Sequence, residues 1–120
     1  MSAPDLIAEL EAALAFSNTA LIIRVPSLIA EIRGPLALRR GSDWLTIGED
    51  QGTHVHLRAA DIARGRLVTS NTANLQLELQ DCAGATLCKV SFRNTNPAKQ
   101  ERFDLELSAR VRARFGHLLQ

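Results

Sequence analysis

The chain has 120 residues, enough for one domain with a substantial core but too few for two. Apolar residues make up 46% and charged residues 22%, which is typical of a globular protein rather than a disordered one. The formal net charge of +1 argues against nucleic acid or an acidic membrane surface as a partner held by bulk attraction. We therefore expect a single domain over residues 1–120.

The two cysteines, Cys82 and Cys88, are too few for a disulfide framework, and their spacing fits neither a CxxC redox pair nor a zinc knuckle. No apolar run approaches the roughly 18 residues that a membrane-spanning helix needs. No segment combines positive charge, a long apolar block and a small-residue cleavage site. These features predict a cytoplasmic protein without membrane insertion.

The first predicted element is a helix. Ser2 can cap it, Pro4 suits an early helical position, and Asp5 completes a capping box. Apolar residues then recur at helical spacing, at Leu6, Ile7, Leu10 and Leu14. The turn-forming pair Ser17 and Asn18 predicts its end.

From residue 19 onwards, short apolar runs bounded by turn residues predict strands. The predicted strands cover residues 21–23, 28–32, 44–47, 54–58, 62–69, 74–80 and 88–92. Residues 34–35, 39–42 and 49–52 are predicted turns. The clearest strand is 74–80, where apolar and polar residues alternate strictly, and residues 81–84 close a hairpin. On the return strand Cys88, Val90 and Phe92 are expected to face inward, and Lys89 and Ser91 outward.

Near the C-terminus apolar residues recur every four positions, at Phe103, Leu107, Val111 and Phe115. This stripe, with Gly116 at its end, predicts a helix. Consecutive strands joined by brief turns between two helices define the expected fold class, α+β. We expect an antiparallel β-sheet meander with an N-terminal and a C-terminal helix packed on one face or at one end.

One predicted strand carries an unusual set of side chains. In an extended chain His54, His56 and Arg58 share one face, and Val55 and Leu57 share the other. Two of the three histidines of the protein therefore lie in one row with a guanidinium. If the protein binds a metal or a metal-centred cofactor, this strand is where we expect the ligand.

The sequence contains no glycine-rich phosphate loop, no GxGxxG, no GxSxG and no HExxH motif. Two interpretations of the HxH strand follow from the residues themselves. A cupin-like metal enzyme would use Gly52, His54, His56 and Asp61, with His117 as the remaining histidine. Alternatively, the histidines are half-exposed strand residues that bind nothing.

A third interpretation comes from resemblance. The segments 28–34, 44–48 and 56–63, the hairpin 75–92 and the final amphipathic helix follow a family order and spacing over most of the chain. In these segments the chain resembles the bacterial haem-utilisation family, the cytoplasmic haem carriers and haem-degrading proteins of Gram-negative bacteria. The resemblance implies an antiparallel sheet with flanking helices. Because this chain holds one copy of a unit that other members carry in tandem, it also implies a homodimer.

The resemblance further implies haem as the cofactor and His56 as the ligand of the haem iron. With no tyrosine in the chain, the phenolate alternative is absent, and His54 is the neighbouring histidine candidate. Haem propionates are carboxylates, so the expected cationic partners are Arg39, Arg40, Arg58, Arg64 and Arg66. The function implied is haem binding or haem trafficking in the cytosol, without catalysis. The alternative is an interaction module that kept the fold and lost the ligand.

Overall fold

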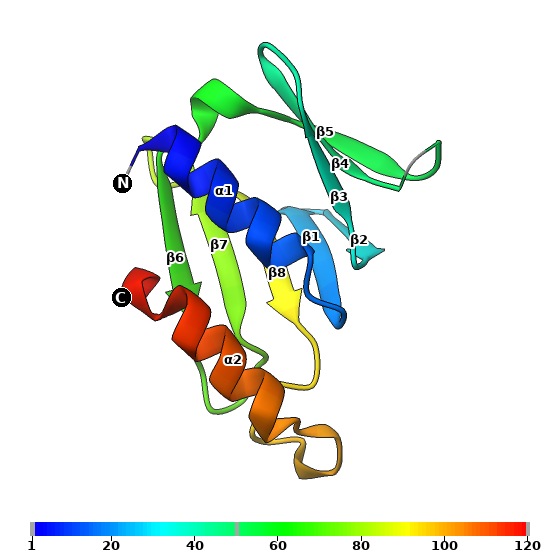
Figure 1. The fold of residues 1–120 in the computed structure, drawn as a ribbon, viewed down its shortest axis with the longest axis vertical. Helices are drawn as coiled ribbons and strands as arrows, with labels where there is room; N and C mark the ends of the chain where they lie inside the picture. The colour runs from blue at the N-terminus through cyan, green and yellow to red at the C-terminus, as the bar shows by residue number, and fades with distance from the viewer. Residues whose placement is uncertain (1, 50, 120) are drawn as a thin grey trace.

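The computed structural model describes residues 2–49 and 51–119, which form two helices, eight strands and three short 3₁₀ turns (Figure 1). The helices are α1 (Ala3–Leu14) and α2 (Leu105–Phe115), and the 3₁₀ turns cover Ala59–Asp61, Gln100–Arg102 and Gly116–Leu118. The strands are β1 (Thr19–Val25), β2 (Leu28–Arg33), β3 (Ala37–Arg40), β4 (Trp44–Gly48), β5 (His54–Arg58), β6 (Arg64–Val68), β7 (Gln76–Gln80) and β8 (Thr86–Phe92). Among the described residues, no helix is both long and apolar enough to cross a membrane.

The strands pair antiparallel in two sheets, which we call sheet A and sheet B. Sheet A has the order β2-β1-β8-β7-β6, and sheet B has the order β3-β4-β5. Two consecutive meanders, β3-β4-β5 and β6-β7-β8, are therefore present. Strand β1 pairs with β8 and so joins the β1–β2 hairpin to the second meander. The predicted α+β class with a helix near each end of the chain is confirmed, with the strands divided between two sheets instead of one.

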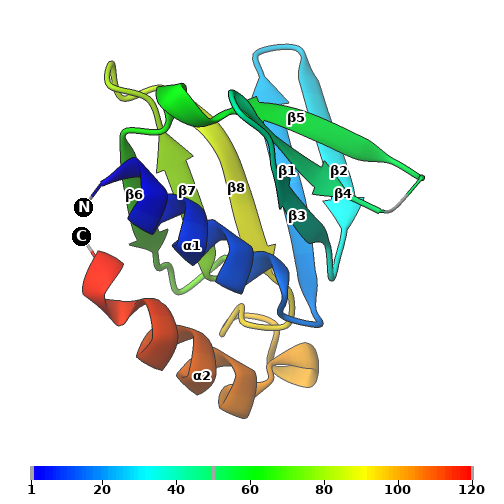
Figure 2. The same cartoon turned by 45° about the horizontal axis from the view of Figure 1, so that its top comes forward.

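Both helices cover the same face of sheet A (Figure 2). The apolar residues of the alternating strands β7 and β8 point to this face, and Leu77, Val90 and Phe92 are fully buried there. Phe92 packs against Phe115 of α2 with ring centroids 5.6 Å apart. Sheet B contributes Leu45 and Ile47 to the same cluster, so that α1 and both sheets share one core.

The helix ends differ in part from the sequence prediction. The Ser2 hydroxyl donates to the Asp5 carboxylate at 2.6 Å and makes no cap hydrogen bond with the backbone. At the other end of the chain the helix begins at Leu105 because the Asp104 side chain accepts from the Leu107 amide, a cap that the apolar stripe does not reveal. Phe103 therefore lies outside α2.

Two further expectations are corrected. Residues 39–40, predicted in a turn, form the end of strand β3, because Arg39 and Arg40 pair with Thr46 and Leu45 of β4. Ser91 lies on the face opposite to Val90 and Phe92, as predicted, but it is buried there, because its small side chain lies between Ala20 of β1 and Gln76 of β7, its partners on either side.

The face of sheet A that the two helices leave uncovered, which we call its free face, contains a buried carboxylate (Figure 2). The Glu78 side chain is 5% exposed and accepts hydrogen bonds from Gln80 at 2.8 Å, Thr86 at 2.9 Å and Arg66 at 3.2 Å. Burial by itself raises the pKa of Glu78, but the hydrogen bonds from Gln80 and Thr86 and the charge of Arg66 outweigh it, and the pKa lies below its usual value. Glu78 is thus held ionised between strands β6, β7 and β8.

We expect Glu78→Gln to lower the free energy of unfolding by about 1 to 2 kcal/mol at pH 7, because the network keeps only a neutral amide oxygen as its acceptor and loses the ion pair with Arg66. A carboxylate with a lowered pKa stabilises the fold above its unfolded-state pKa, and this contribution is lost as the pH falls through the folded-state pKa. The deficit of the variant should therefore shrink below about pH 4. Urea unfolding at pH 7 and pH 3.5 measures this, with the exposed Glu101→Gln as control. A deficit that is equal at both pH values would contradict it.

Candidate functional site

The candidate site is the outer face of sheet B, which neither α1 nor α2 covers (Figure 2). Cross-strand register places Arg39, Thr46 and His56 in one row across the three strands. Trp44 and Arg58 form the next row, on the same face. The opposite face carries Val55 and Leu57, which pack against the core, so the predicted division of β5 into a polar and an apolar face is confirmed.

The two histidines of β5 are exposed side by side. Their ring centroids are 5.1 Å apart and their planes are inclined by 69°. The Nδ1 atom of His56 is 3.1 Å from the Thr46 hydroxyl, and the Nδ1 atom of His54 is 2.8 Å from the Gly52 carbonyl oxygen. In each ring one nitrogen is thus engaged by the protein, and no hydrogen bond to Nε2 is formed within the described chain.

A glycine makes room for His54. Gly48 of β4 is the register partner of His54, and a Cβ atom at Gly48 would lie 2.6 Å from the Cα atom and 2.7 Å from the Cβ atom of His54. Contacts that short do not occur between real side chains, so this position on β4 excludes any larger residue. The sequence signal for this constraint is the Gly48 that ends the run 44–48.

Arg58 is held between an aromatic ring and a carboxylate. Its guanidinium carbon lies 4.5 Å from the ring centroid of Trp44, in a cation–π contact. Its Nε atom lies 3.8 Å from a carboxylate oxygen of Asp61, which follows in the 3₁₀ turn. Trp44 is 44% exposed, so part of a large flat aromatic surface faces solvent beside a positive charge.

A cavity of about 480 Å³ opens on this face. It is lined by the β3–β4 turn and by the adjoining strand residues: Gly41, Ser42, Asp43, Trp44, Thr46 and His56. A second hollow of about 310 Å³, lined in part by Arg39 and Thr46, lies beside it. The first cavity falls within the range of small-molecule sites, and it combines an aromatic wall with an imidazole.

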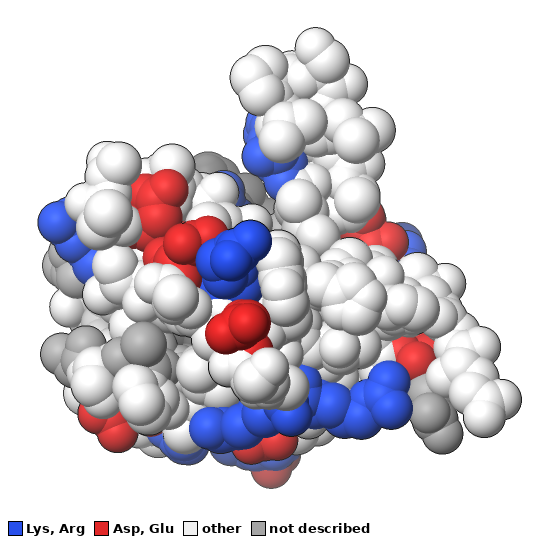
Figure 3. All heavy atoms as spheres, turned by 90° about the horizontal axis from the view of Figure 1, so that it is seen from above, with Lys and Arg blue, Asp and Glu red and all other residues white. Residues whose placement is uncertain are grey.

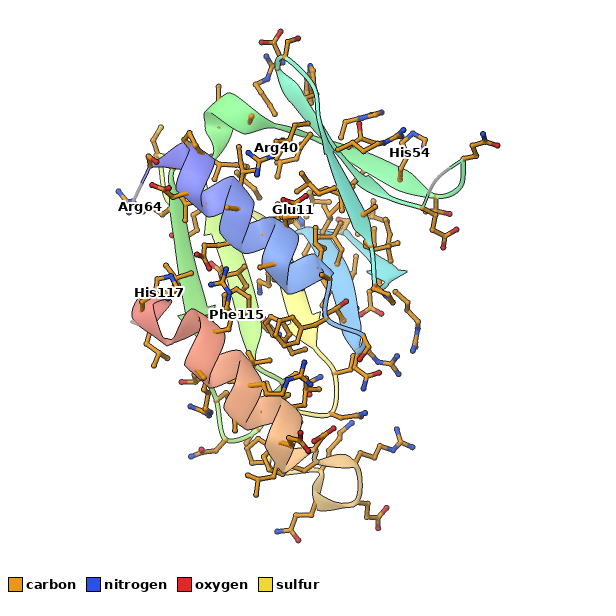
Figure 4. The ribbon with its side chains drawn as sticks, viewed as in Figure 1. Glu11, Arg40, His54, Arg64, Phe115 and His117 are labelled. Carbon is orange, nitrogen blue, oxygen red and sulfur yellow. The ribbon has the colours of Figure 1, made fainter. Side chains whose placement is uncertain are left out.

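The cationic residues expected from the sequence are only partly brought together. Arg39 and Arg58 lie on the outer face of sheet B with His56. Arg40 lies on the opposite face, where its Nη2 atom is 3.6 Å from a carboxylate oxygen of Glu11 of α1. Figure 4 labels both residues. Arg64 and Arg66 lie on β6 of sheet A, where Arg66 pairs with Glu78, and Figure 4 shows Arg64 far from His54.

The ligand set of a cupin-like site is not assembled. Asp61 forms an ion pair with Arg58. His117 lies in the 3₁₀ turn that follows α2, with its Nε2 atom 3.5 Å from a carboxylate oxygen of Glu9 in α1, and Figure 4 shows it on the other side of the molecule from His54. Within residues 2–49 and 51–119, no group of three or more His, Cys, Asp or Glu side chains could hold a metal ion. A cupin-like site needs a third ligand beside His54 and His56, and the described residues do not supply one. The cupin-like interpretation is therefore wrong. Trp44, Thr46 and Gly48 are the site residues that the sequence analysis did not single out.

The likeness of the fold to solved structures is extensive, although no family model and no curated protein matches the sequence. The haem-binding protein ChuX superposes with a TM-score of 0.68 and 13% identity, over 95% of this chain and 70% of that chain. A protein from Erwinia carotovora gives a TM-score of 0.70 and 16% identity, with coverages of 95% and 72%. These proteins define the fold class, an α+β domain of the ChuX type.

A larger protein contains a similar unit. The haem-binding protein PhuS from Pseudomonas aeruginosa, in its holo form, superposes with a TM-score of 0.58 and 21% identity. The match covers 77% of this chain but only 28% of PhuS. The chain therefore has the fold that its sequence resemblance implied.

Proposed function

We propose that this protein binds haem on the outer face of sheet B, with His56 as the ligand of the iron, and that it carries haem in the cytosol. The observation that supports this most directly is the cavity of about 480 Å³ in which His56 lies with Trp44. Structural neighbours that bind haem, ChuX and PhuS, support the same class of ligand.

The residues of this face fit what a haem group requires. A planar macrocycle needs an apolar surface, an axial nitrogen for its iron and cations for its propionates. Trp44 supplies an exposed aromatic surface, and the Nδ1 contact with Thr46 leaves Nε2 of His56 as the free ring nitrogen. Arg58 supplies a guanidinium positioned by Trp44 and Asp61. When bound, haem would contribute an iron centre that accepts this nitrogen.

In this proposal the propionate partners are Arg58 and Arg39, which share the face with His56. Arg40, Arg64 and Arg66 are directed elsewhere and take no part. On this exposed three-stranded sheet, the described residues would hold the macrocycle from one side. Such a site suits the transfer of haem between proteins better than catalysis, which calls for an enclosed centre from which water is excluded.

We further propose that two copies associate through the free face of sheet A. A groove of about 400 Å³ runs along this face, with Ile22 and Ile29 beside Arg24, Glu31 and Lys89. In the hairpin formed by β1 and β2, Ile29 is 55% exposed and Leu28, at the tip, is 65% exposed. The β1–β2 hairpin extends beyond the body of the molecule in Figure 2, and Figure 3 shows a projecting lobe whose end is uncharged and one flank of which carries Lys or Arg side chains. In this proposal Arg24 and Lys89 of one copy pair with Glu31 of the other.

The first prediction concerns the histidines. Hemin added to the wild-type protein should give a shifted Soret band, His56→Ala should abolish this shift, and His54→Ala should leave most of it. The control is His117→Ala, which removes an imidazole at the far end of the molecule. If His56→Ala binds hemin equally well with an unchanged spectrum, the assignment of the ligand is wrong. If the wild type binds no hemin, the interaction module without a ligand is the better description.

The second prediction concerns Arg58. We expect Arg58→Ala to weaken hemin binding roughly two- to fivefold, the effect of one exposed ion pair, without moving the Soret band. The exposed Arg112 of α2 provides a matched control, because Arg112→Ala removes the same charge from the opposite side of the core. Equal losses in the two variants would show that Arg58 acts only through net charge.

The third prediction concerns assembly. Light scattering at micromolar concentration should give twice the mass of the chain for the wild type and a single-chain mass for Ile29→Asp, because a charged carboxylate would replace an apolar side chain in the contact and would have to be desolvated there. Leu105→Asp, which places the same charge at an apolar residue 71% exposed on α2, should leave the dimer intact. A monomeric wild type, or a dimer that tolerates Ile29→Asp, would contradict the proposed interface.

A further inference from the structure

The two imidazoles of β5 are spaced as two ligands of one metal ion would be. An ion bound at Nε2 lies about 2 Å from that atom and therefore about 3 Å from the ring centroid. Two such rings at a right angle or a tetrahedral angle about the ion have centroids roughly 4.5 to 5.2 Å apart. The rings of His54 and His56 are 5.1 Å apart. Their separation thus falls within the range for two ligands of one ion, and it is also that of an edge-to-face contact between the two rings.

The hydrogen bonds of the rings also leave the correct nitrogen free. The carbonyl oxygen of Gly52 can only accept, so a neutral His54 carries its proton on Nδ1 and a lone pair on Nε2. The hydroxyl of Thr46 can accept in the same way from Nδ1 of His56. A metal-binding imidazole usually donates its second ring N–H to a carbonyl or another polar group, and this contact orients the ligand. Both rings therefore have the orienting contact in place before any ion binds.

From this geometry we propose that His54 and His56 form a two-histidine site for a divalent transition-metal ion, with Cu²⁺ as the preferred ion. Two neutral imidazoles favour copper, nickel and zinc over magnesium or calcium, which prefer oxygen ligands. For a given set of nitrogen ligands, Cu²⁺ binds more tightly than Ni²⁺ or Zn²⁺. Because both side chains are exposed on an edge strand, the remaining coordination positions are open to water.

This inference does not rest on the proposed function. Haem requires His56 and leaves His54 dispensable, whereas the metal ion requires both. The variant His54→Ala separates the two activities, since it should bind hemin and fail to chelate the ion. Metal binding can therefore fail while haem binding holds, and the reverse.

The test uses the full chain with CuCl₂ as the probe, at pH 7.4 in a buffer that does not chelate metals. Calorimetric titration should give one Cu²⁺ per chain at this site, bound more tightly than Ni²⁺ from NiCl₂. The electron paramagnetic resonance spectrum of the bound ion should show coupling to two imidazole nitrogens. His54→Ala and His56→Ala should each weaken the binding at least tenfold, and His117→Ala should leave it unchanged.

Three outcomes would overturn the proposal. They are a Cu²⁺ affinity that His54→Ala leaves unaltered, an equal loss in the His117→Ala control, and a spectrum with a single coupled nitrogen. Because all three histidines are exposed, none of these substitutions removes a core contact. Circular dichroism of each variant checks that the fold is retained, so that a loss of binding reports the ligand itself.

Discussion

The burial of one face of sheet B determines what its other face can carry. Leu45 and Ile47 of β4 are almost completely buried, and Val55 and Leu57 of β5 pack against the same cluster as α1. Because side chains alternate along a strand, this packing fixes the register of β4 and β5. A slip by one residue would put His54, His56 and Arg58 into the core. The apolar contacts of Val55 and Leu57 therefore keep His54, His56 and Arg58 on the exposed face of β5.

The cross-strand register gives the site its composition. Thr46 stands opposite His56, and Trp44 stands opposite Arg58. These pairs are adjacent on one face, so the hydroxyl orients the imidazole and the indole ring supports the guanidinium. Residues that lie ten or more positions apart in the sequence thus form a patch of aromatic, imidazole and cationic groups. A short antiparallel sheet supplies these groups, and the β3–β4 turn and Asp61 of the following 3₁₀ turn complete the surroundings of the patch.

The sequence predicts this arrangement where a local pattern controls it. Strict alternation identifies β7 and β8, and the HxH run identifies the polar face of β5, because period two is a property of each strand alone. Strand β3 is not predicted, because the charged residues Arg39 and Arg40 next to Gly41 and Ser42 are typical of a turn. Short edge strands with charged side chains are nevertheless a common way to protect the edge of a sheet. The positions of the five candidate arginines depend on strand pairing, which a local sequence pattern does not determine. Arg40 and Arg39 diverge by alternation once β3 is recognised, whereas Arg64 and Arg66 belong to sheet A through pairing with β7.

The two histidines are neighbours on one strand, yet their surroundings give them different chemistry. His54 is next to a backbone carbonyl, which accepts only, and therefore has one neutral tautomer in this position. His56 faces a hydroxyl, which can donate or accept, so its ring can exchange the roles of its two nitrogens without losing the contact. His56 is also the histidine that lines the cavity beside Trp44. The two rings of one HxH run thus differ in the group that each contacts, a carbonyl oxygen for His54 and a hydroxyl for His56.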